Sequence, residues 1–183
     1  MEALLLGLSL GLAAGLSPGP LLFLVLREAT RKGPRAGVLA ALAPLFTDAP
    51  VVAAAWLLSG RLAPELLRAI GALGGLWLLF SGVRGLFTPP REPKAPDAQS
   101  LKAGVLANLA NPHMYLFWFG VGMPLLARLG GGAVLFLLGF YLTLVGSKIA
   151  LALLAGRLPA LGRVADLLLA LAGAWLILRS AAP

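Results

Sequence analysis

The sequence predicts an all-α integral membrane protein of six transmembrane helices, arranged as two inverted three-helix repeats with broken helices 1 and 4. Three observations lead to this prediction. Of the 183 residues, 60% are hydrophobic and 12% are charged, and the mean hydropathy is +0.93. So little charge could not cover the surface of a soluble domain. The charged residues divide the chain into apolar segments of about the length that crosses a bilayer, and prolines interrupt the first and fourth of them.

Four of the apolar segments contain at most one ionisable residue. They are 3–26 with none, 36–60 with Asp48, 103–127 with His113, and 129–156 with Lys148. Two weaker segments are 66–87, with Arg68 and Arg84 near its ends, and 160–180, with Arg163 and Asp166 at its start. Charges at such positions can reach the membrane interface. We therefore predict six spans. The chain begins Met1-Glu2 with no basic residue before its apolar run, which is atypical of a signal peptide and favours a retained first span.

Basic residues are unequally divided between the two sides of the predicted membrane. The breaks after spans one, three and five share one side, which has ten of them: Arg27, Arg31, Lys32, Arg35, Arg84, Arg91, Lys94, Lys102, Arg157 and Arg163. The other side has four: Arg61, Arg68, Arg128 and Arg179. Because cytoplasmic loops are enriched in Lys and Arg, we predict a multi-pass protein of the cell inner (cytoplasmic) membrane with both termini outside.

A proline-rich polar stretch, "TPPREPKAPDAQSLK", divides the chain at residues 88–102. Its composition is typical of a linker, which we place in the cytoplasm. It separates a first three-helix repeat, 1–87, from a second, 103–183. Because three is odd, two similar halves would lie in the membrane in opposite orientations. Aligning "AGLSPGPLLFLVL" with "NLANPHMYLFWFG" matches Pro18 with Pro112, where an inverted repeat would have them.

Composition excludes several classes of function. The chain has no cysteine and one histidine, so disulfides, thiol redox chemistry and Cys-ligated metals are excluded. The net charge of +8 comes mostly from residues between the apolar segments, without a basic face interleaved with aromatics, so no nucleic-acid partner is expected. No cofactor and no metal site are predicted. The expected partners are a small-molecule substrate, protons and the lipid bilayer, and a homodimer is left open.

The two helix breaks are candidate binding elements. Ser17-Pro18 and Asn111-Pro112 each place a good N-cap residue before a proline, which is tolerated at the first helical position. Each pair therefore predicts a helix start inside a span, with unpaired N–H groups and partial positive charge near mid-depth, suited to a carboxylate. The alternative is that the prolines only kink the helices. The predicted substrate-binding residues are Ser17, Pro18, Gly19, Pro20, Asp48, Asn108, Asn111 and Pro112.

Three ionisable residues lie within the predicted spans. A carboxylate at the depth of Asp48 costs roughly 2.5–3.5 kcal/mol on insertion scales, so it should have a proton, a partner or a function; a neutral, hydrogen-bonded structural Asp is the alternative. We predict that Asp48 binds the substrate amine and exchanges protons, with His113 as a second proton-coupling candidate. Lys148 either pairs with Asp48 or reaches the cytoplasmic interface.

Gly7, Gly11, Gly15 and Gly19 recur every four residues and place a smooth stripe on one face of span one. Close helix packing is the preferred interpretation. The same stripe would also allow span one to rock during transport.

Several of these motifs together resemble the LysE/RhtB family of amino-acid exporters. They are "SPGP" near the N-terminus, the basic "REATRKGPRAG" at 27–37, and "NPHMYLFW" at 111–118. The likeness spans essentially the whole chain. It implies a six-helix, inverted-repeat exporter that moves amino acids outward in exchange for protons. Carried over by position, the family's motifs fall on Pro18-Gly19-Pro20, Asp48 and Asn111-Pro112, whereas the family commonly has lysine where this chain has His113.

The sequence therefore predicts a secondary transporter, not an enzyme, that exports amino acids or similar small zwitterionic solutes by proton antiport. One alternative is a metal-ion or other small-solute exporter of the same superfamily, although seven acidic residues, mostly in loops, offer poor metal ligation. Another is a membrane-embedded enzyme, for which the chain lacks a paired-carboxylate motif and has only His113 as a base. A lipid-handling or purely structural protein is the remaining alternative.

Overall fold

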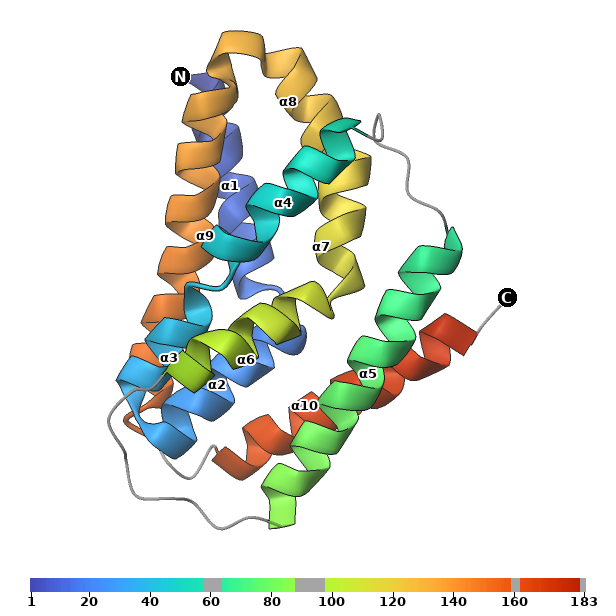
Figure 1. Cartoon of the computed structure of the whole chain (residues 1–183). Helices are drawn as coiled ribbons and strands as arrows, with labels where there is room; N and C mark the ends of the chain where they lie inside the picture. Colours follow the sequence, from blue (N-terminus) through green and yellow to red (C-terminus); the bar gives the residue numbers. More distant parts are fainter. Residues whose placement is uncertain (58–63, 88–97, 159–161, 182–183) are drawn as a thin grey trace.

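The computed structural model describes residues 1–57, 64–87, 98–158 and 162–181, and all regular structure among them is helical (Figure 1). The helices are α1 Glu2–Leu16, α2 Pro20–Lys32, α3 Pro34–Ala41, α4 Pro44–Leu57, α5 Pro64–Phe87, α6 Ala98–Leu109, α7 Pro112–Phe117, α8 Met123–Leu129, α9 Ala133–Ala155 and α10 Gly162–Ala181. A π-helical segment, η1 (Trp118–Gly122), joins α7 to α8, and a 3-10 turn, η2 (Gly130–Gly132), joins α8 to α9. The all-helical prediction is confirmed for these residues.

Two helical stretches of the described chain are long and apolar enough to cross a membrane, Pro34–Ala55 and Pro112–Ala155. A third arises if α1 and α2, which are bent by 65° at their junction, are counted as one broken span. The longer stretch reverses direction between α8 and α9, at Gly130 with its positive φ of 49° (Figure 1). Apolar helices of membrane type are therefore present, and the six-span inverted repeat stays a prediction.

The first break differs in detail from its prediction. Ser17 is the residue that ends α1, and its hydroxyl donates back to the Ala13 carbonyl over 2.7 Å. Gly19 is fully extended (φ −177°, ψ 178°) and precedes Pro20, the first residue of α2. The predicted helix start at Pro18 with Ser17 as its N-cap is therefore wrong. Pro18 ends α1 because it has no amide hydrogen to continue the helix. The Ser17 hydroxyl cannot cap a following helix because it already bonds to the preceding turn.

The break before α7 is as predicted. Asn111 is the N-cap, its side-chain oxygen accepts the His113 amide hydrogen over 3.1 Å, and Pro112 is the first helical residue. Residues 88–97 of the predicted linker lie outside the described residues, and α6 begins at Ala98, inside the predicted range. Arg61, Arg91 and Lys94 of the charge comparison also lie outside the described residues.

A further break divides the second predicted span. Leu42 and Ala43 separate α3 from α4, and Pro44 begins α4. This break positions Thr47 and Asp48 near the N-terminal end of α4, where both side chains are buried. Residues 36–60 were expected to form one continuous span, so this break was not predicted.

Glycines bring two pairs of long helices together. A Cβ on Gly7 or Gly11 of α1 would overlap the backbone of α9 at Phe136 or Phe140, and one on Gly15 would overlap the Ser147 hydroxyl. The predicted close-packing role is confirmed for these three, whereas a Cβ on Gly19 would meet nothing within 4 Å. In the same way, α5 packs closely along α10 at a separate set of glycines, Gly75, Gly82 and Gly173.

Polar contacts hold α2 between α10 and α6. Arg27 and Arg31 both donate to the fully buried carboxylate of Asp166 on α10, with the Arg27 Nε at 2.8 Å. On the other side, the Ser100 hydroxyl of α6 donates to Glu28 over 2.7 Å. The N-terminus and the α8–α9 turn lie at one end of the molecule, and the α2–α3 turn and the start of α10 lie at the other (Figure 1).

Candidate functional site

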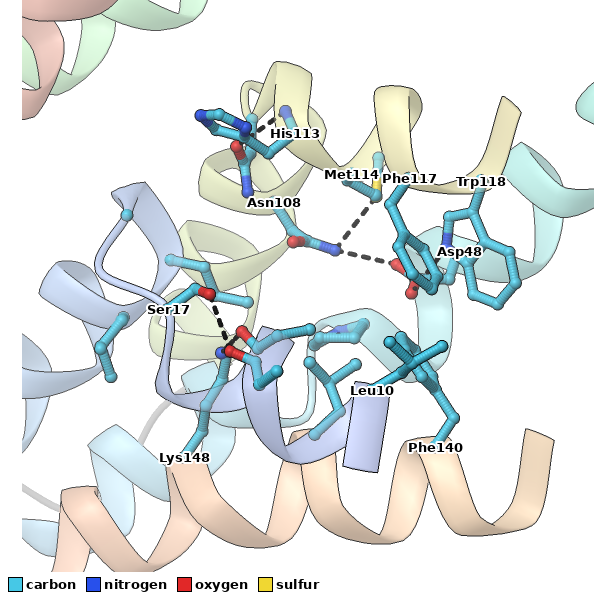
Figure 2. Close-up of a pocket in the computed structure, with 18 of the residues that line it drawn as sticks. Leu10, Ser17, Asp48, Asn108, His113, Met114, Phe117, Trp118, Phe140 and Lys148 are labelled. Carbon is cyan, nitrogen blue, oxygen red and sulfur yellow. Dashed lines mark hydrogen bonds between the residues drawn. The ribbon is translucent and has the colours of Figure 1, made fainter. Parts of the chain in front are cut away.

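A cavity of about 480 Å³ brings most of the predicted site residues together. It lies where the α1–α2 break, the α6–α7 break, α4 and α9 meet (Figure 2). Eight of the ten predicted residues line it: Ser17, Pro18, Gly19, Asp48, Asn108, Asn111, His113 and Lys148. Pro20 and Pro112 are not among the lining residues, although each begins a helix beside the cavity.

Asp48 is 3% exposed and faces four hydrogen-bond partners. The Asn108 amide donates to Oδ1 over 3.0 Å, and the Trp118 indole N–H donates to Oδ2 over 3.1 Å. The hydroxyls of Thr47 and Tyr141 each lie 3.3 Å from a carboxyl oxygen. Amide and indole N–H groups can only donate, whereas hydroxyls can donate or accept. The carboxyl is thus held by two fixed donors and two adaptable groups.

The residues around Asp48 come from four separate helical segments. Asn108 belongs to α6 and also donates to the Thr47 hydroxyl over 2.7 Å and to the Met114 sulfur over 3.3 Å. Sequence reasoning missed Thr47, Met114, Trp118 and Tyr141. One signal was available for Tyr141, since it precedes Lys148 by seven residues, which is two helical turns on one face.

The π-helical segment sets the position of the Trp118 indole. A Cβ on Gly122 would overlap the Trp118 ring, so only glycine leaves room for the ring in this arrangement. The ring also lies edge-on to Phe140, with centroids 5.5 Å apart. Single π-helical turns inside α-helices recur at functional sites, and here the turn aims a donor at the buried carboxyl.

Lys148 takes neither of its two predicted arrangements. It is 4% exposed, and its ammonium donates to the Gly15 carbonyl over 2.8 Å and to the Ala14 carbonyl over 3.3 Å. Among the described residues, no ion pair within 4.0 Å joins it to Asp48. Figure 2 shows Lys148 extending from α9 to the end of α1, while Asp48 lies beside Asn108 and Trp118. The carbonyl of Ala14, in the last turn of α1 before the break, is one of its acceptors.

His113 lies in the first turn of α7, as predicted, and lines the cavity. Its side chain is exposed, and its ring stacks on Trp175 of α10 with centroids 5.7 Å apart and planes 10° apart. The contact joins the second helix break to α10.

The two helix starts beside the cavity differ in their caps. Asn111 already occupies the His113 amide of α7. The α2 start has Gly19 as its N-cap and therefore no side-chain cap, and its first-turn residues Leu21 and Leu22 line the cavity. Unpaired N–H groups at a helix start attract anions. Of the two breaks, α2 is therefore the better place for a carboxylate.

The remaining walls of the cavity are largely apolar, and they contain Leu10, Met114, Phe117, Phe140 and Leu144. Among the described lining residues, Asp48 is the only carboxylate and Lys148 the only ammonium. The described part of the chain contains no group of three or more His, Cys, Asp or Glu side chains arranged to hold a metal ion. The geometry is that of a small, mostly apolar chamber with one buried group of each charge.

The chain is similar to a known protein family. A family model described as LysE type translocator matches residues 12–179, which include every residue that lines the cavity except Leu10. No curated protein and no solved structure gives a significant match to the chain. Because the family model covers nearly the whole chain, including both helix breaks, Asp48 and Lys148, the protein belongs to the LysE type translocator family.

Proposed function

We propose that this protein is a secondary transporter that exports amino acids or similar small zwitterionic solutes in exchange for protons. As a LysE type translocator it is a membrane exporter of small solutes, and its family is one of transporters rather than enzymes. The substrate class and the coupling ion are the proposed parts. The main support for both is the buried carboxyl of Asp48, which lies in a mostly apolar cavity and has only neutral hydrogen-bond partners.

Asp48 suits a substrate ammonium because it forms no direct ion pair with any of the described residues. Neutral donors reduce the cost of burying a carboxylate but do not cancel its charge. An ammonium group entering the cavity would supply that charge and form a charge-assisted hydrogen bond, which is stronger than a neutral one. The carboxylate of the substrate would then lie toward the uncapped start of α2, near Leu21 and Leu22.

The same carboxyl can exchange protons because its surroundings suit both protonation states. Ionised, it accepts from Asn108 and Trp118. Protonated, it can donate to the hydroxyl oxygen of Thr47 or Tyr141, which rotate to accept. Arrival of an ammonium favours the ionised form and releases the proton, and substrate departure favours its return. One carboxyl would thereby couple two opposed fluxes.

The two helix breaks support movement of the kind that alternating access requires. In transporters built from inverted repeats, broken helices meet at the binding site, and the repeats move relative to one another. Here the α1–α2 and α6–α7 junctions both border the cavity. We propose that residues 1–87 and 103–183 are the two repeats and that both termini face outward.

The test is flux through purified protein in liposomes, measured against a panel of amino acids with and without a pH gradient. The wild type should move at least one amino acid faster with the gradient. Asp48→Asn retains the size of the side chain and one acceptor oxygen but cannot ionise, so flux should fall about tenfold or more and lose its response to the gradient.

The control for that experiment is Glu2→Gln, which removes a carboxyl that is exposed at the N-terminus. It should transport as the wild type does. If Asp48→Asn protein still responds to the gradient like the wild type, Asp48 is not the coupling residue, and His113 becomes the candidate.

A further inference from the structure

The ammonium of Lys148 is a buried charge with no direct ion-pair partner among the described residues. It is 4% exposed, and its acceptors are the neutral carbonyls of Ala14 and Gly15. An ammonium has three N–H donors, so these two carbonyls leave one for another partner. Buried charges are normally paired with an opposite charge, because desolvation is otherwise costly. A mobile anion in the cavity would supply the missing partner.

Lys148 and Asp48 border the same cavity from different directions. Tyr141, which contacts Asp48, and Lys148 are seven residues apart on α9, about 10 Å along its axis and on one face. The two charges are too far apart for the direct ion pair that would cancel them. A solute with both an ammonium and a carboxylate can neutralise both ends of the cavity at once.

We infer that Lys148 is a substrate-binding residue that holds the anionic end of a zwitterion, and that the cavity selects zwitterions whose side chain is uncharged and apolar. This inference rests on the proposed function, because it assumes that Asp48 receives the ammonium. The uncapped start of α2 borders the same cavity, since Leu21 and Leu22 line it together with Lys148. The carbonyls of Ala14 and Gly15 serve as resting acceptors for Lys148 between substrates.

The apolar preference follows from the lining of the cavity. With Asp48 used by the α-ammonium, no second carboxylate among the described lining residues is left for a cationic side chain. An anionic side chain would compete with the α-carboxylate for Lys148. Leu10, Phe117, Phe140 and Leu144 instead provide apolar surface, which favours an aliphatic side chain by burial.

The first arm of the test uses wild-type protein in liposomes and three probes. They are leucine, its carboxylate-free analogue 3-methylbutylamine, and lysine, which adds a second positive charge. Competition against leucine uptake should show leucine binding about tenfold or more tightly than either of the others, because one charge-assisted interaction is worth at least a factor of about ten.

The second arm removes the charge of Lys148. Lys148→Gln retains an amide that can donate to the α1 carbonyls, and Lys102→Gln, an exposed position on α6, is the matched control. In Lys148→Gln, the advantage of leucine over 3-methylbutylamine should shrink severalfold or more, because only the start of α2 remains for the carboxylate, while affinity for the amine is unchanged or higher. Lys102→Gln should retain the wild-type ratio. A purely structural role for Lys148 would weaken both probes together and leave their ratio intact.

The possible results distinguish a failure of the inference about Lys148 from a failure of the proposed amino-acid export. If the wild type moves no amino acid under a proton gradient, the proposed function and the inference both fall. If it moves amino acids but prefers lysine, or if Lys148→Gln retains the wild-type ratio, the proposed function stands and the inference is overturned. Should Lys148→Gln fail to fold, judged by size-exclusion chromatography, the three-probe comparison on the wild type still decides, because equal affinity for leucine and 3-methylbutylamine would contradict an anion-binding Lys148.

Discussion

At the scale of single residues, this protein places one carboxyl and one ammonium in an apolar chamber without pairing them. Asp48 is surrounded by side chains that accommodate either of its protonation states. Lys148 donates hydrogen bonds to backbone carbonyls in the last turn of α1. The sequence marked both residues as unusual because charges are costly inside a membrane. Their partners could not be identified from the sequence, since Asn108, Trp118 and Tyr141 reach Asp48 from separate helices.

The clearest test of this arrangement at one residue is Gly122→Ala. The added methyl group would overlap the Trp118 ring and displace the indole from Asp48. Losing one hydrogen bond to a charged group is worth about 1.5–3 kcal/mol, so gradient-driven flux should fall about tenfold or more. Flux in liposomes is the measurement.

Gly120→Ala is the matched control, because it lies in the same π-helical segment and its Cβ would have nothing within 4 Å. It should transport like the wild type. Trp118→Phe removes the donor without adding bulk and should reproduce the loss seen in Gly122→Ala. Normal coupling in Trp118→Phe would mean that the indole N–H does not contribute to the function of Asp48.

At the scale of helices, the residues next to the helix breaks form most of the polar part of the cavity. The α1–α2 junction supplies acceptors for Lys148 and an uncapped helix start, and the α6–α7 junction supplies Asn108 and a helix start capped by Asn111. The contacts of Arg27 and Arg31 with Asp166 hold α2 against α10. The helix that follows the first break is therefore fixed against α10.

The α6–α7 break should depend on its cap and its proline together. Pro112→Ala alone leaves the Asn111 cap in place, so we expect the break and most of the flux to persist. In the double variant Asn111→Ala/Pro112→Ala, the cap is lost, at a typical cost of about 1 kcal/mol, and a continuous helix becomes available. Flux should then fall severalfold more than the amount of folded protein, measured by chromatography on the same samples.

Asn111→Ala by itself is the comparison variant for that experiment. If the double variant transports as well as the wild type does, the break is only a kink with no part in transport. That outcome would favour the alternative in which neighbouring helices repair the lost backbone bonds.

At the scale of the whole molecule, two sets of helix ends lie at opposite extremes (Figure 1). The N-terminus and the α8–α9 turn lie at one end, and the α2–α3 turn and the start of α10 lie at the other (Figure 1). The second group includes Arg31, Lys32, Arg35, Arg157 and Arg163. By the enrichment of basic residues in cytoplasmic loops, this end should face the cytoplasm.

Single cysteines test this orientation directly, because the natural chain contains none. A cysteine at Gly131, which is exposed in the α8–α9 turn, should react with an impermeant thiol reagent in intact cells. A cysteine at Arg157, exposed beyond the end of α9, should react only after the cells are opened. The reverse pattern would invert the topology, and labelling of both sites in intact cells would contradict it.

The sequence alone determined the features that depend on local chemistry. Hydropathy identified an all-helical membrane protein, since apolar segments of that length have few other stable states. Proline located the breaks near Pro18 and Pro112, because a residue without an amide hydrogen cannot continue the backbone bonds of the preceding helix, although Pro50 is accommodated inside α4. Asn111 was correctly predicted as a cap because its partner, His113, is two residues away.

Only the tertiary structure decided what depends on distant segments. Ser17 bonds backward to Ala13, because a hydroxyl can serve either helix at a junction and geometry decides between them. Lys148 contacts the end of α1, 133 residues away in the chain, rather than Asp48. No local pattern encodes such a contact, because it requires the glycine-mediated packing of α1 on α9 to bring the two together. The burial of two opposite, unpaired charges in one cavity is therefore a property of the fold.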